Sequence, residues 1–366
     1  MTELLVGTKK GLFVLQGDPA RGGAGFAISG RAFAGEPVEC AIRDRRRGRL
    51  FAAAASPFYG PKLWYCDTEP ESWADGGPDA WRQAEGLAMP QPSGQALKKI
   101  WVIVCGQDDD TLYAGADPGV LFESSDGGES WQVNEALFQH PTRPQWQPGG
   151  GGLCVHSIAT WPGEPARLAL GVSAAGVWCS EDGGASWSQG NDGLVPRYLP
   201  EQARQGATAL CIHHLERSAS RPERMFMQFH GGVYRSDDAG RSWVDIGAGL
   251  PSDFGFPLAL DPADPDSAYV IPMNADVDRV TCGGRVQVFE TRDGGETWVA
   301  RGEGLPDGDA YLTVLRCAFT SAGAGEALEL YFGATSGQLF GSADAGASWF
   351  TIASHLPPIF SVSAAR

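Results

Sequence analysis

Short runs of alternating apolar and polar residues, divided by turns rich in glycine and proline, recur along the whole chain. The runs come in pairs that are typical of β-hairpins, for example LYAGADPGVLFES from Leu112 and LYFGATSGQLFGS from Leu330. The seven pairs that can be aligned begin at Leu4, Leu50, Leu112, Leu168, Met225, Ala268 and Leu330. No long segment has the period of an amphipathic helix. The pattern predicts an all-β protein built from seven copies of one unit.

A short phrase follows five of the seven hairpins. It has the form Ser/Thr-x-Asp-x-Gly-x-Ser/Thr-Trp, as in SSDGGESW at residues 124–131. Its aspartates and tryptophans are Asp126, Asp182, Asp238, Asp293, Asp344, Trp131, Trp187, Trp243, Trp298 and Trp349. The copies recur at intervals of about 50 to 56 residues, which indicates a repeat architecture in which each unit buries an apolar face against the next.

Each part of the phrase has a physical role in a tight turn. The Asp126 carboxylate can accept hydrogen bonds from backbone N–H groups, and the two hydroxyls can tie the turn together. Gly128 permits a backbone geometry that is closed to bulkier residues. The Trp131 indole can fill an apolar layer while its N–H finds a partner. The phrase therefore predicts a rigid turn that ends in an anchored tryptophan.

The phrase resembles the Asp box, or BNR repeat, of sialidases, xyloglucanases, sortilin-type receptors and photosystem II assembly factors. The resemblance covers nearly the whole chain and implies a β-propeller. It also implies that each box lies in the turn between the third and fourth strands of a blade, away from the binding face. On that basis the five aspartates are expected to be structural rather than catalytic.

The hairpin alignment sets the phase of the blades. The repeats at Leu4 and Leu50 lack the full phrase but bring the number of blades to seven. The chain starts in a second strand, at residues 4–7, and ends in a first strand without a partner of its own, at residues 359–364. The two ends of the chain should therefore share one blade.

Pairing of the two ends would close the ring and remove the free sheet edges of an open one. We predict a single domain over residues 1–366, a seven-bladed β-propeller of four-stranded antiparallel blades. Its first blade would join residues from about 1–34 to residues 359–366.

The net negative charge of the chain argues against some classes of binding partner. Lys and Arg number 28 against 44 Asp and Glu, a formal net charge of −16 that repels a phosphate backbone and argues against nucleic acid. The first residues lack the apolar core and cleavage site of a signal peptide, and no stretch is long enough to span a bilayer. We therefore expect a cytoplasmic protein with no membrane partner.

The cysteines do not form a recognisable framework. Five of the eight lie in or beside the predicted innermost strands, where cysteine acts as a small apolar filler: Cys40, Cys105, Cys154, Cys211 and Cys317. No Cys-x-x-Cys occurs, which disfavours a structural zinc site of that type.

Long irregular segments gather on one predicted face of the disc. They span residues 56–61, 88–96, 138–152, 195–206 and 273–284, whereas the turns of the other face are short or regular. Long loops on a rigid scaffold are where binding residues are usually placed, and propellers offer a central depression there. The phasing therefore predicts the functional site on the loop-rich face.

Histidines supply the candidate chemistry of that face. His156 and His230 are predicted to reach it, and together with His214 and Asp276 they are our candidate catalytic acid/base groups. A divalent metal held by His156, His213 and His230 is an alternative, because imidazole is a common metal ligand. The third interpretation is that loop carbonyls satisfy each histidine separately.

Basic and aromatic side chains in or near the same loops are candidates for substrate binding. They are Lys98, Arg143, Trp146, Arg197, Tyr198 and Tyr59. Arginine can hold a carboxylate through paired N–H donors, and aromatic rings can stack on a sugar. Loop anchoring is the alternative for the aromatic residues. The Arg-Ile-Pro motif that opens the arginine triad of sialidases is absent, so that triad cannot be transferred to this chain.

Three functions are compatible with these residues. The resemblance and the loop asymmetry favour a sialidase-like or glycosyl hydrolase-like propeller that binds and hydrolyses a polar small-molecule or carbohydrate substrate in a central pocket. A non-catalytic scaffold that holds a peptide or protein on the same face is the alternative. A metal-dependent enzyme that uses the histidine cluster is the third.

Overall fold

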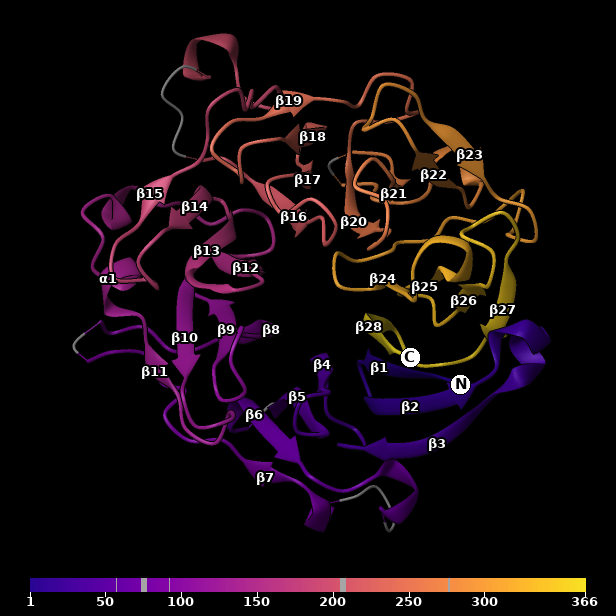
Figure 1. Ribbon diagram of the computed structural model, residues 1–366, viewed down its shortest axis with the longest axis horizontal. Helices are drawn as coiled ribbons and strands as arrows, with labels where there is room; N and C mark the ends of the chain where they lie inside the picture. Colours follow the sequence, from indigo (N-terminus) through magenta and orange to yellow (C-terminus); the bar gives the residue numbers. More distant parts are fainter. Residues whose placement is uncertain (57, 74–77, 92, 205–208, 276) are drawn as a thin grey trace.

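The protein forms a ring of seven four-stranded antiparallel sheets, as the sequence predicted (Figure 1). The computed structural model describes residues 1–56, 58–73, 78–91, 93–204, 209–275 and 277–366. Within these ranges no helix is both long and apolar enough to cross a bilayer.

Each blade is a meander whose four strands run from the axis of the ring to its rim. The innermost strands are β4 (Val38–Asp44), β8 (Lys99–Cys105), β12 (Cys154–Trp161), β16 (Ile212–Arg217), β20 (Gly255–Leu260), β24 (Phe319–Ala322) and β28 (Ile359–Ala365). The second strands are β1 (Thr2–Thr8), β5 (Arg49–Ser56), β9 (Leu112–Asp117), β13 (Glu164–Ser173), β17 (Met225–Phe229), β21 (Ala268–Pro272) and β25 (Glu329–Gly333).

The fourth strand is shorter than the third in five of the seven blades. The third strands are β2 (Gly11–Gly17), β6 (Gly60–Cys66), β10 (Val120–Ser124), β14 (Gly176–Ser180), β18 (Gly232–Ser236), β22 (Val288–Thr291) and β26 (Leu339–Ser342). The fourth strands are β3 (Phe26–Ala32), β7 (Arg82–Gln83), β11 (Gln132–Val133), β15 (Ser188–Gln189), β19 (Val244–Asp245), β23 (Val299–Arg301) and β27 (Phe350–Ala353).

Within the described residues, helical structure consists of short segments between strands. These are α1 (Glu135–Phe138), η1 (Pro19–Gly25), η2 (Pro70–Ser72), η3 (Pro78–Ala80), η4 (Arg143–Gln145), η5 (Glu201–Ala203), η6 (Cys282–Gly284) and η7 (Gly325–Ala327).

The two ends of the chain close the ring in the predicted way. Strand β28 pairs antiparallel with β1, from Glu3 opposite Ala365 to Thr8 opposite Ile359. The chain termini consequently lie in one blade, as the N and C labels show (Figure 1). Ile359 and Val362 of β28 are buried, so this strand contributes to the core as well as to the sheet.

The five boxes form turns between third and fourth strands. In the first of them the Asp126 carboxylate accepts hydrogen bonds from the backbone N–H groups of Glu129 and Ser130, each at 3.0 Å. It also accepts the hydroxyls of Ser124 at 2.8 Å and Ser130 at 2.6 Å. Asp182, Asp238, Asp293 and Asp344 accept the same two hydroxyl contacts in their own turns.

The tryptophan of each box packs between neighbouring blades. Trp131 belongs to the same apolar cluster as Phe51 of the preceding blade. Four of the five indole N–H groups find an acceptor: Trp131 bonds Gly128, Trp187 bonds Asn134, Trp243 bonds Gly190 and Trp298 bonds Ile246. The boxes therefore bind each blade to the next, and this makes the ring a rigid support for the groups at its axis.

Candidate functional site

Six innermost strands share an irregularity close to their first residue. At that point the strand has one residue more than its neighbour, which is a β-bulge. The bulged positions hold Glu39, Trp101, His156, His213, Phe256 and Phe360. A bulge turns its side chain out of the regular alternation of the strand. In the seventh blade Arg316, in the turn before β24, takes the corresponding place, and we call these seven residues the bulge ring.

The bulge ring surrounds a cavity on the axis of the propeller. This axial cavity has a volume of about 410 Å³ and lies where the innermost strands begin, on the loop-rich face. Six members of the ring line it: Glu39, Trp101, His213, Phe256, Arg316 and Phe360. All seven blades contribute to its wall, since Ser173 on β13 completes the circle. Equivalent positions in six blades therefore supply side chains of five different kinds to one space.

Arg316 is the most unusual of these groups. Its side chain is 7% exposed, and its Nε donates to the His213 carbonyl at 3.0 Å. The guanidinium lies 4.7 Å from the ring centroid of Trp101, and no ion pair joins it to a carboxylate among the described residues. A buried charge without a counter-ion destabilises the fold. An anion that bound beside this guanidinium would supply the counter-charge.

Among the described residues that line the cavity, three side chains are basic and two are acidic. The basic ones are Lys99, Arg279 and Arg316, and the acidic ones are Glu39 and Asp278. The Lys99 ammonium pairs with Glu39 at 2.7 Å and also lies 4.0 Å from the Trp101 ring centroid. This positive site stands out against a chain with a formal charge of −16.

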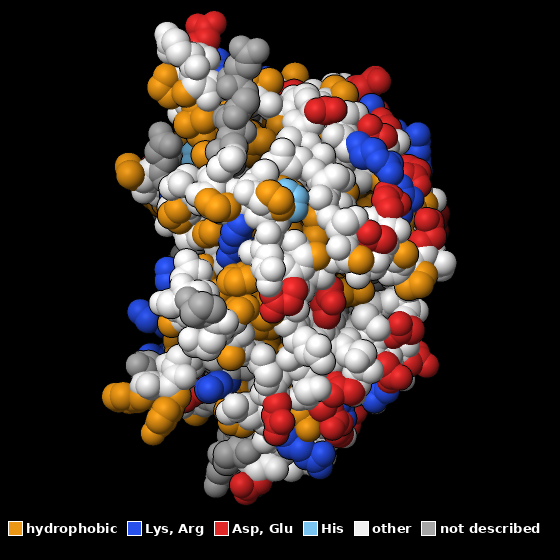
Figure 2. All heavy atoms as spheres, turned by 90° about the vertical axis from the view of Figure 1, so that its left-hand side faces the viewer, with side chains coloured by type: hydrophobic (Ala, Val, Ile, Leu, Met, Phe, Trp, Pro, Cys, Tyr) orange, Lys and Arg blue, Asp and Glu red, His pale blue; other side chains and the backbone are white. Residues whose placement is uncertain are grey.

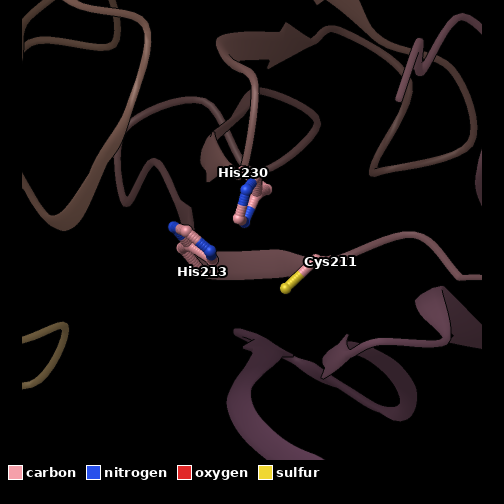
Figure 3. Close-up of side chains that lie close together, drawn as sticks. All are labelled: Cys211, His213 and His230. Atoms are coloured by element: carbon pink, nitrogen blue, oxygen red, sulfur yellow. The ribbon is translucent and has the colours of Figure 1, made fainter. Parts of the chain in front are cut away.

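A second cluster lies in the wall of the axial cavity. The side-chain donor atoms of Cys211, His213 and His230 all lie within 4.8 Å of one another. Cys211 and His213 flank Ile212 at the start of β16, and His230 occupies the turn between β17 and β18. Figure 3 shows that the three side chains lie close together.

Hydrogen bonding fixes the state of His213. Its Nδ1 lies 2.6 Å from the Gly255 carbonyl, which can only accept, so Nδ1 carries the proton and the lone pair is on Nε2. Burial, aided by the positive charge of Arg316, holds the pKa of His213 well below its ordinary value. His213 is therefore a neutral base or ligand.

Cys211 and His230 are held by shared neighbours. Burial raises the pKa of the Cys211 thiol, while the Ser173 hydroxyl, 3.1 Å from its sulfur, opposes that shift. The Tyr198 hydroxyl accepts the Cys211 backbone N–H at 2.9 Å, and the Tyr198 ring packs against His230 with centroids 4.4 Å apart. One tyrosine thus positions both residues.

Two of the candidate catalytic histidines lie deeper along the axis. His156 and His214 line a second cavity of about 270 Å³, which shares Trp101 with the axial cavity. His156 Nε2 bonds the Ile212 carbonyl at 2.7 Å, and burial lowers the pKa of His214 to about 4. Of the four candidates only His230 lines the axial cavity, and Asp276 lies outside the described residues.

Three candidate substrate-binding residues are loop anchors in this structure. Arg143 donates to the carbonyls of Pro118 and Gly119, and burial lowers its pKa to about 10. Trp146 is 6% exposed and packs against Trp178. Arg197 pairs with Asp245 at 2.5 Å. Each of these three side chains therefore has protein partners.

The other three candidates differ from one another. Tyr198 supports the cluster of Cys211, His213 and His230, because its hydroxyl accepts the Cys211 backbone N–H and its ring packs against His230. Lys98 is exposed at the start of β8, and Tyr59 is 80% exposed in the β5–β6 turn. That turn lies at the same end of its blade as Glu39, because β4 and β5 are antiparallel.

Arg316 was not among the residues predicted from the sequence, and Cys211 was predicted to be an apolar filler. A signal for the site is nevertheless present in the aligned innermost strands. The residue after the first aliphatic position is Glu39 in VECAI, Trp101 in IWVIV, His213 in IHHLE and Arg316 in LRCAF. Equivalent positions that differ in this way mark the side chains that point to the axis.

Comparisons with known proteins identify the fold. No family model matches the chain. An oligoxyloglucan-reducing end-specific xyloglucanase of Emericella nidulans is 23% identical over 238 residues, which are 57% of this chain and 28% of that protein. An ancestral GH74 enzyme superposes with a TM-score of 0.59 at 15% identity, over 86% of this chain and 38% of that one.

A structure of YCF48 bound to D1 peptide also superposes. Its TM-score is 0.50 at 14% identity, over 83% of this chain and 78% of that one. At such identities the likeness is one of fold alone. The chain spans well under half the length of that xyloglucanase and of that ancestral GH74 enzyme.

Proposed function

We propose that the chain is a glycosidase-like propeller that binds a small anionic carbohydrate in the axial cavity and hydrolyses it there. The observation that carries the proposal is the Arg316 guanidinium, 7% exposed and without a carboxylate partner among the described residues. A ligand carboxylate would supply the missing counter-charge through paired hydrogen bonds. The preferred class of ligand is therefore a sugar that carries a carboxylate.

The size and lining of the axial cavity fit a ligand of this class. A volume of about 410 Å³ has room for one or two sugar rings but not for a long chain. Trp101, Phe256 and Phe360 offer aromatic surface on which the apolar face of a sugar can pack. The cationic and aromatic walls together favour an acidic sugar over a neutral one.

Hydrolysis would require groups that transfer protons at the same place. Glu39 and Asp278 line the axial cavity and are able to do so. Two carboxylic groups, one as acid and one as base or nucleophile, are the usual equipment of glycosidases. The similarity in sequence to a xyloglucanase and in fold to a GH74 enzyme supports the same reaction class.

Direct binding measurements test the proposal. Calorimetric titration with glucuronate, galacturonate and N-acetylneuraminate should give binding for at least one acid, and the matching neutral sugar should bind at least 10-fold more weakly. Aryl glycosides of the acid that binds should then be cleaved. Equal affinity for acidic and neutral sugars, or no binding of any acid, would show that the proposal is wrong.

Substitution of the key arginine localises the binding. Arg316→Gln should weaken binding of the acid by about 10- to 100-fold. Arg241→Gln is the matched control, because Arg241 lies in a box turn on the other face, half-exposed, and its loss changes the net charge equally. Lys99→Met provides a second variant of the cavity if Arg316→Gln does not fold.

A peptide that ends in a free carboxylate is the second candidate ligand. Two exposed aromatic residues favour it: Phe58, 87% exposed, and Tyr59, 80% exposed, project from the β5–β6 turn on the same side as Glu39. The peptide-bound YCF48 relative supports this mode of use. Peptides with a free C-terminus should then bind at least 10-fold better than their amidated forms, and better than every acidic sugar.

A further inference from the structure

We propose that Cys211, His213 and His230 bind one Zn²⁺ ion in the wall of the axial cavity, with one coordination position open to the cavity. The inference does not depend on the identity of the organic ligand. It rests on three donor side chains that two adjacent strands bring to one point.

The donor set suits zinc. One thiolate and two imidazoles are ligands of the type that Zn²⁺ prefers, and three protein ligands with an open position are typical of catalytic rather than structural zinc. The donor atoms lie within 4.8 Å of one another, and closure around the ion requires side-chain movements of about 1 Å to reach bond lengths of about 2.0–2.3 Å. His230 lies in the turn between β17 and β18.

The surroundings already orient the donors. The Nδ1–H of His213 donates to a backbone carbonyl and directs Nε2 as the ligand atom, which is the usual outer-shell arrangement of metal-bound histidine. The Ser173 hydroxyl can donate to the Cys211 sulfur, and Tyr198 holds the backbone of Cys211 and the ring of His230. The bulge in β16 aims His213 at the axis.

The charge balance explains the open position. On binding, the Cys211 thiol loses its proton to solvent and a sulfur–zinc bond forms, which leaves a net charge of +1 at the site. Arg279 and Arg316 add positive charge in the same cavity. The fourth ligand is therefore expected to be water, hydroxide or an anion rather than another neutral side chain.

Packing of the aromatic rings provides the competing explanation of this cluster. The ring of His213 packs on Phe256 with centroids 4.7 Å apart, and His230 packs on Phe254 at 5.2 Å. If packing were the only role of these histidines, the sulfur of Cys211 would have no influence on metal binding. The zinc proposal therefore predicts that the Cys211 thiol is needed for metal binding, and the packing explanation predicts that it is not.

Metal titration of the chelator-treated full chain tests the proposal. We expect one equivalent of Zn²⁺ to bind, and Co²⁺ in its place to show thiolate-to-cobalt charge-transfer absorption. Cys211→Ser should remove that absorption and weaken Zn²⁺ binding by at least about 100-fold. Cys317→Ser is the matched control, since it removes a thiol of the same cavity that lies outside the cluster, and it should bind Zn²⁺ like the parent chain.

A second ligand variant keeps the test decisive if Cys211→Ser does not fold. His230→Gln alters a turn residue and should also weaken Zn²⁺ binding by at least about 100-fold, with an unchanged circular dichroism spectrum. Binding of less than one equivalent by the parent chain, or parental affinity in a folded ligand variant, would overturn the zinc site. Titration of an acidic sugar into metal-free protein decides the proposed function separately.

Discussion

The box turns and the bulge ring are both periodic, but the ring of blades uses them in opposite ways. Five boxes repeat one carboxylate, one glycine and one tryptophan, with the same hydrogen bonds each time. The bulged positions instead hold an acid, imidazoles and aromatic rings, and Arg316 stands at the corresponding place in the seventh blade. In this repeat protein, the positions that hold the same residue in each unit therefore build the scaffold. The equivalent positions that hold different residues supply the chemical groups of the site.

The two regions also differ in surface chemistry. Viewed from its edge, the disc carries acidic and basic side chains crowded on one face, whereas hydrophobic side chains and some basic ones project from the opposite face (Figure 2). The box carboxylates are ionised and bonded within their turns. At the axis, by contrast, buried groups such as Arg316 lack a protein counter-ion among the described residues.

The strongest test of the scaffold is removal of β28. Deletion of residues 359–366 exposes the edge of β1 and removes the buried Ile359 and Val362, so it should destabilise the fold by at least about 5 kcal/mol or abolish cooperative folding. Deletion of Arg366 alone is the control and should cost only about 1 kcal/mol, because its side chain is half-exposed and its pair with the buried Glu329 is long, at 3.6 Å. Thermal unfolding measures both, and an unchanged midpoint in the longer deletion would contradict closure by the chain ends.

A box glycine tests the packing between blades. Gly128 has a φ of 88°, and a Cβ there would lie 2.4 Å from Phe51 Cε1. Gly128→Ala should therefore cost about 2–4 kcal/mol. Gly48→Ala is the matched control: its φ is also positive, 71°, but nothing lies within 4 Å, and about 1 kcal/mol is expected. Equal urea midpoints for the two variants would show that blade contact adds nothing to backbone strain.

Glu216 tests the axial side of the comparison. It lines the second cavity, its Oε2 is buried without a hydrogen bond, and burial raises its pKa to about 8 against the opposing effect of Arg217. Because the folded pKa exceeds the unfolded value of about 4.3, the unfolded state loses this proton first, and stability should fall as the pH rises from about 4 to 8.

Glu216→Gln removes that titration. The variant should be about 1–3 kcal/mol more stable than the parent chain at pH 8 and nearly equal to it at pH 4. Urea unfolding at both pH values measures the difference. A parent chain whose stability rises between pH 4 and 8, with no gain in the variant, would show that Glu216 is ionised at the axis.

The fold was predictable from sequence because its determinants are local and repeated. The hairpin alternation, the box spacing and the phase of the two ends each need only nearby residues, and all led to seven closed blades.

The axial site is harder to predict from the sequence because bulges change the direction of single side chains. His156 and His213 occupy equivalent positions, yet only His213 lines the axial cavity. Convergence of Cys211 with His230 depends on pairing between β16 and β17, and no spacing in the sequence encodes that contact.

The smallest effect is expected from a single box carboxylate. Partial burial of Asp126 opposes its ionisation, but hydrogen bonds from Ser130 and Ser124 prevail and lower its pKa to about 2. Because the folded pKa lies below the unfolded value of about 3.9, this stabilisation is present above pH 4 and is lost as the pH falls towards 2. The turn is exposed, so Asp126→Asn should cost only about 1 kcal/mol at pH 7 and almost nothing at pH 2. Asp109→Asn, in the exposed turn between β8 and β9, is the control for the loss of one surface carboxylate and should cost less than about 0.5 kcal/mol at pH 7. The boxes lie at the opposite end of the blades from the axial cavity, so Asp126→Asn should not change ligand binding. Reduced ligand binding would show that the box turns are not purely structural.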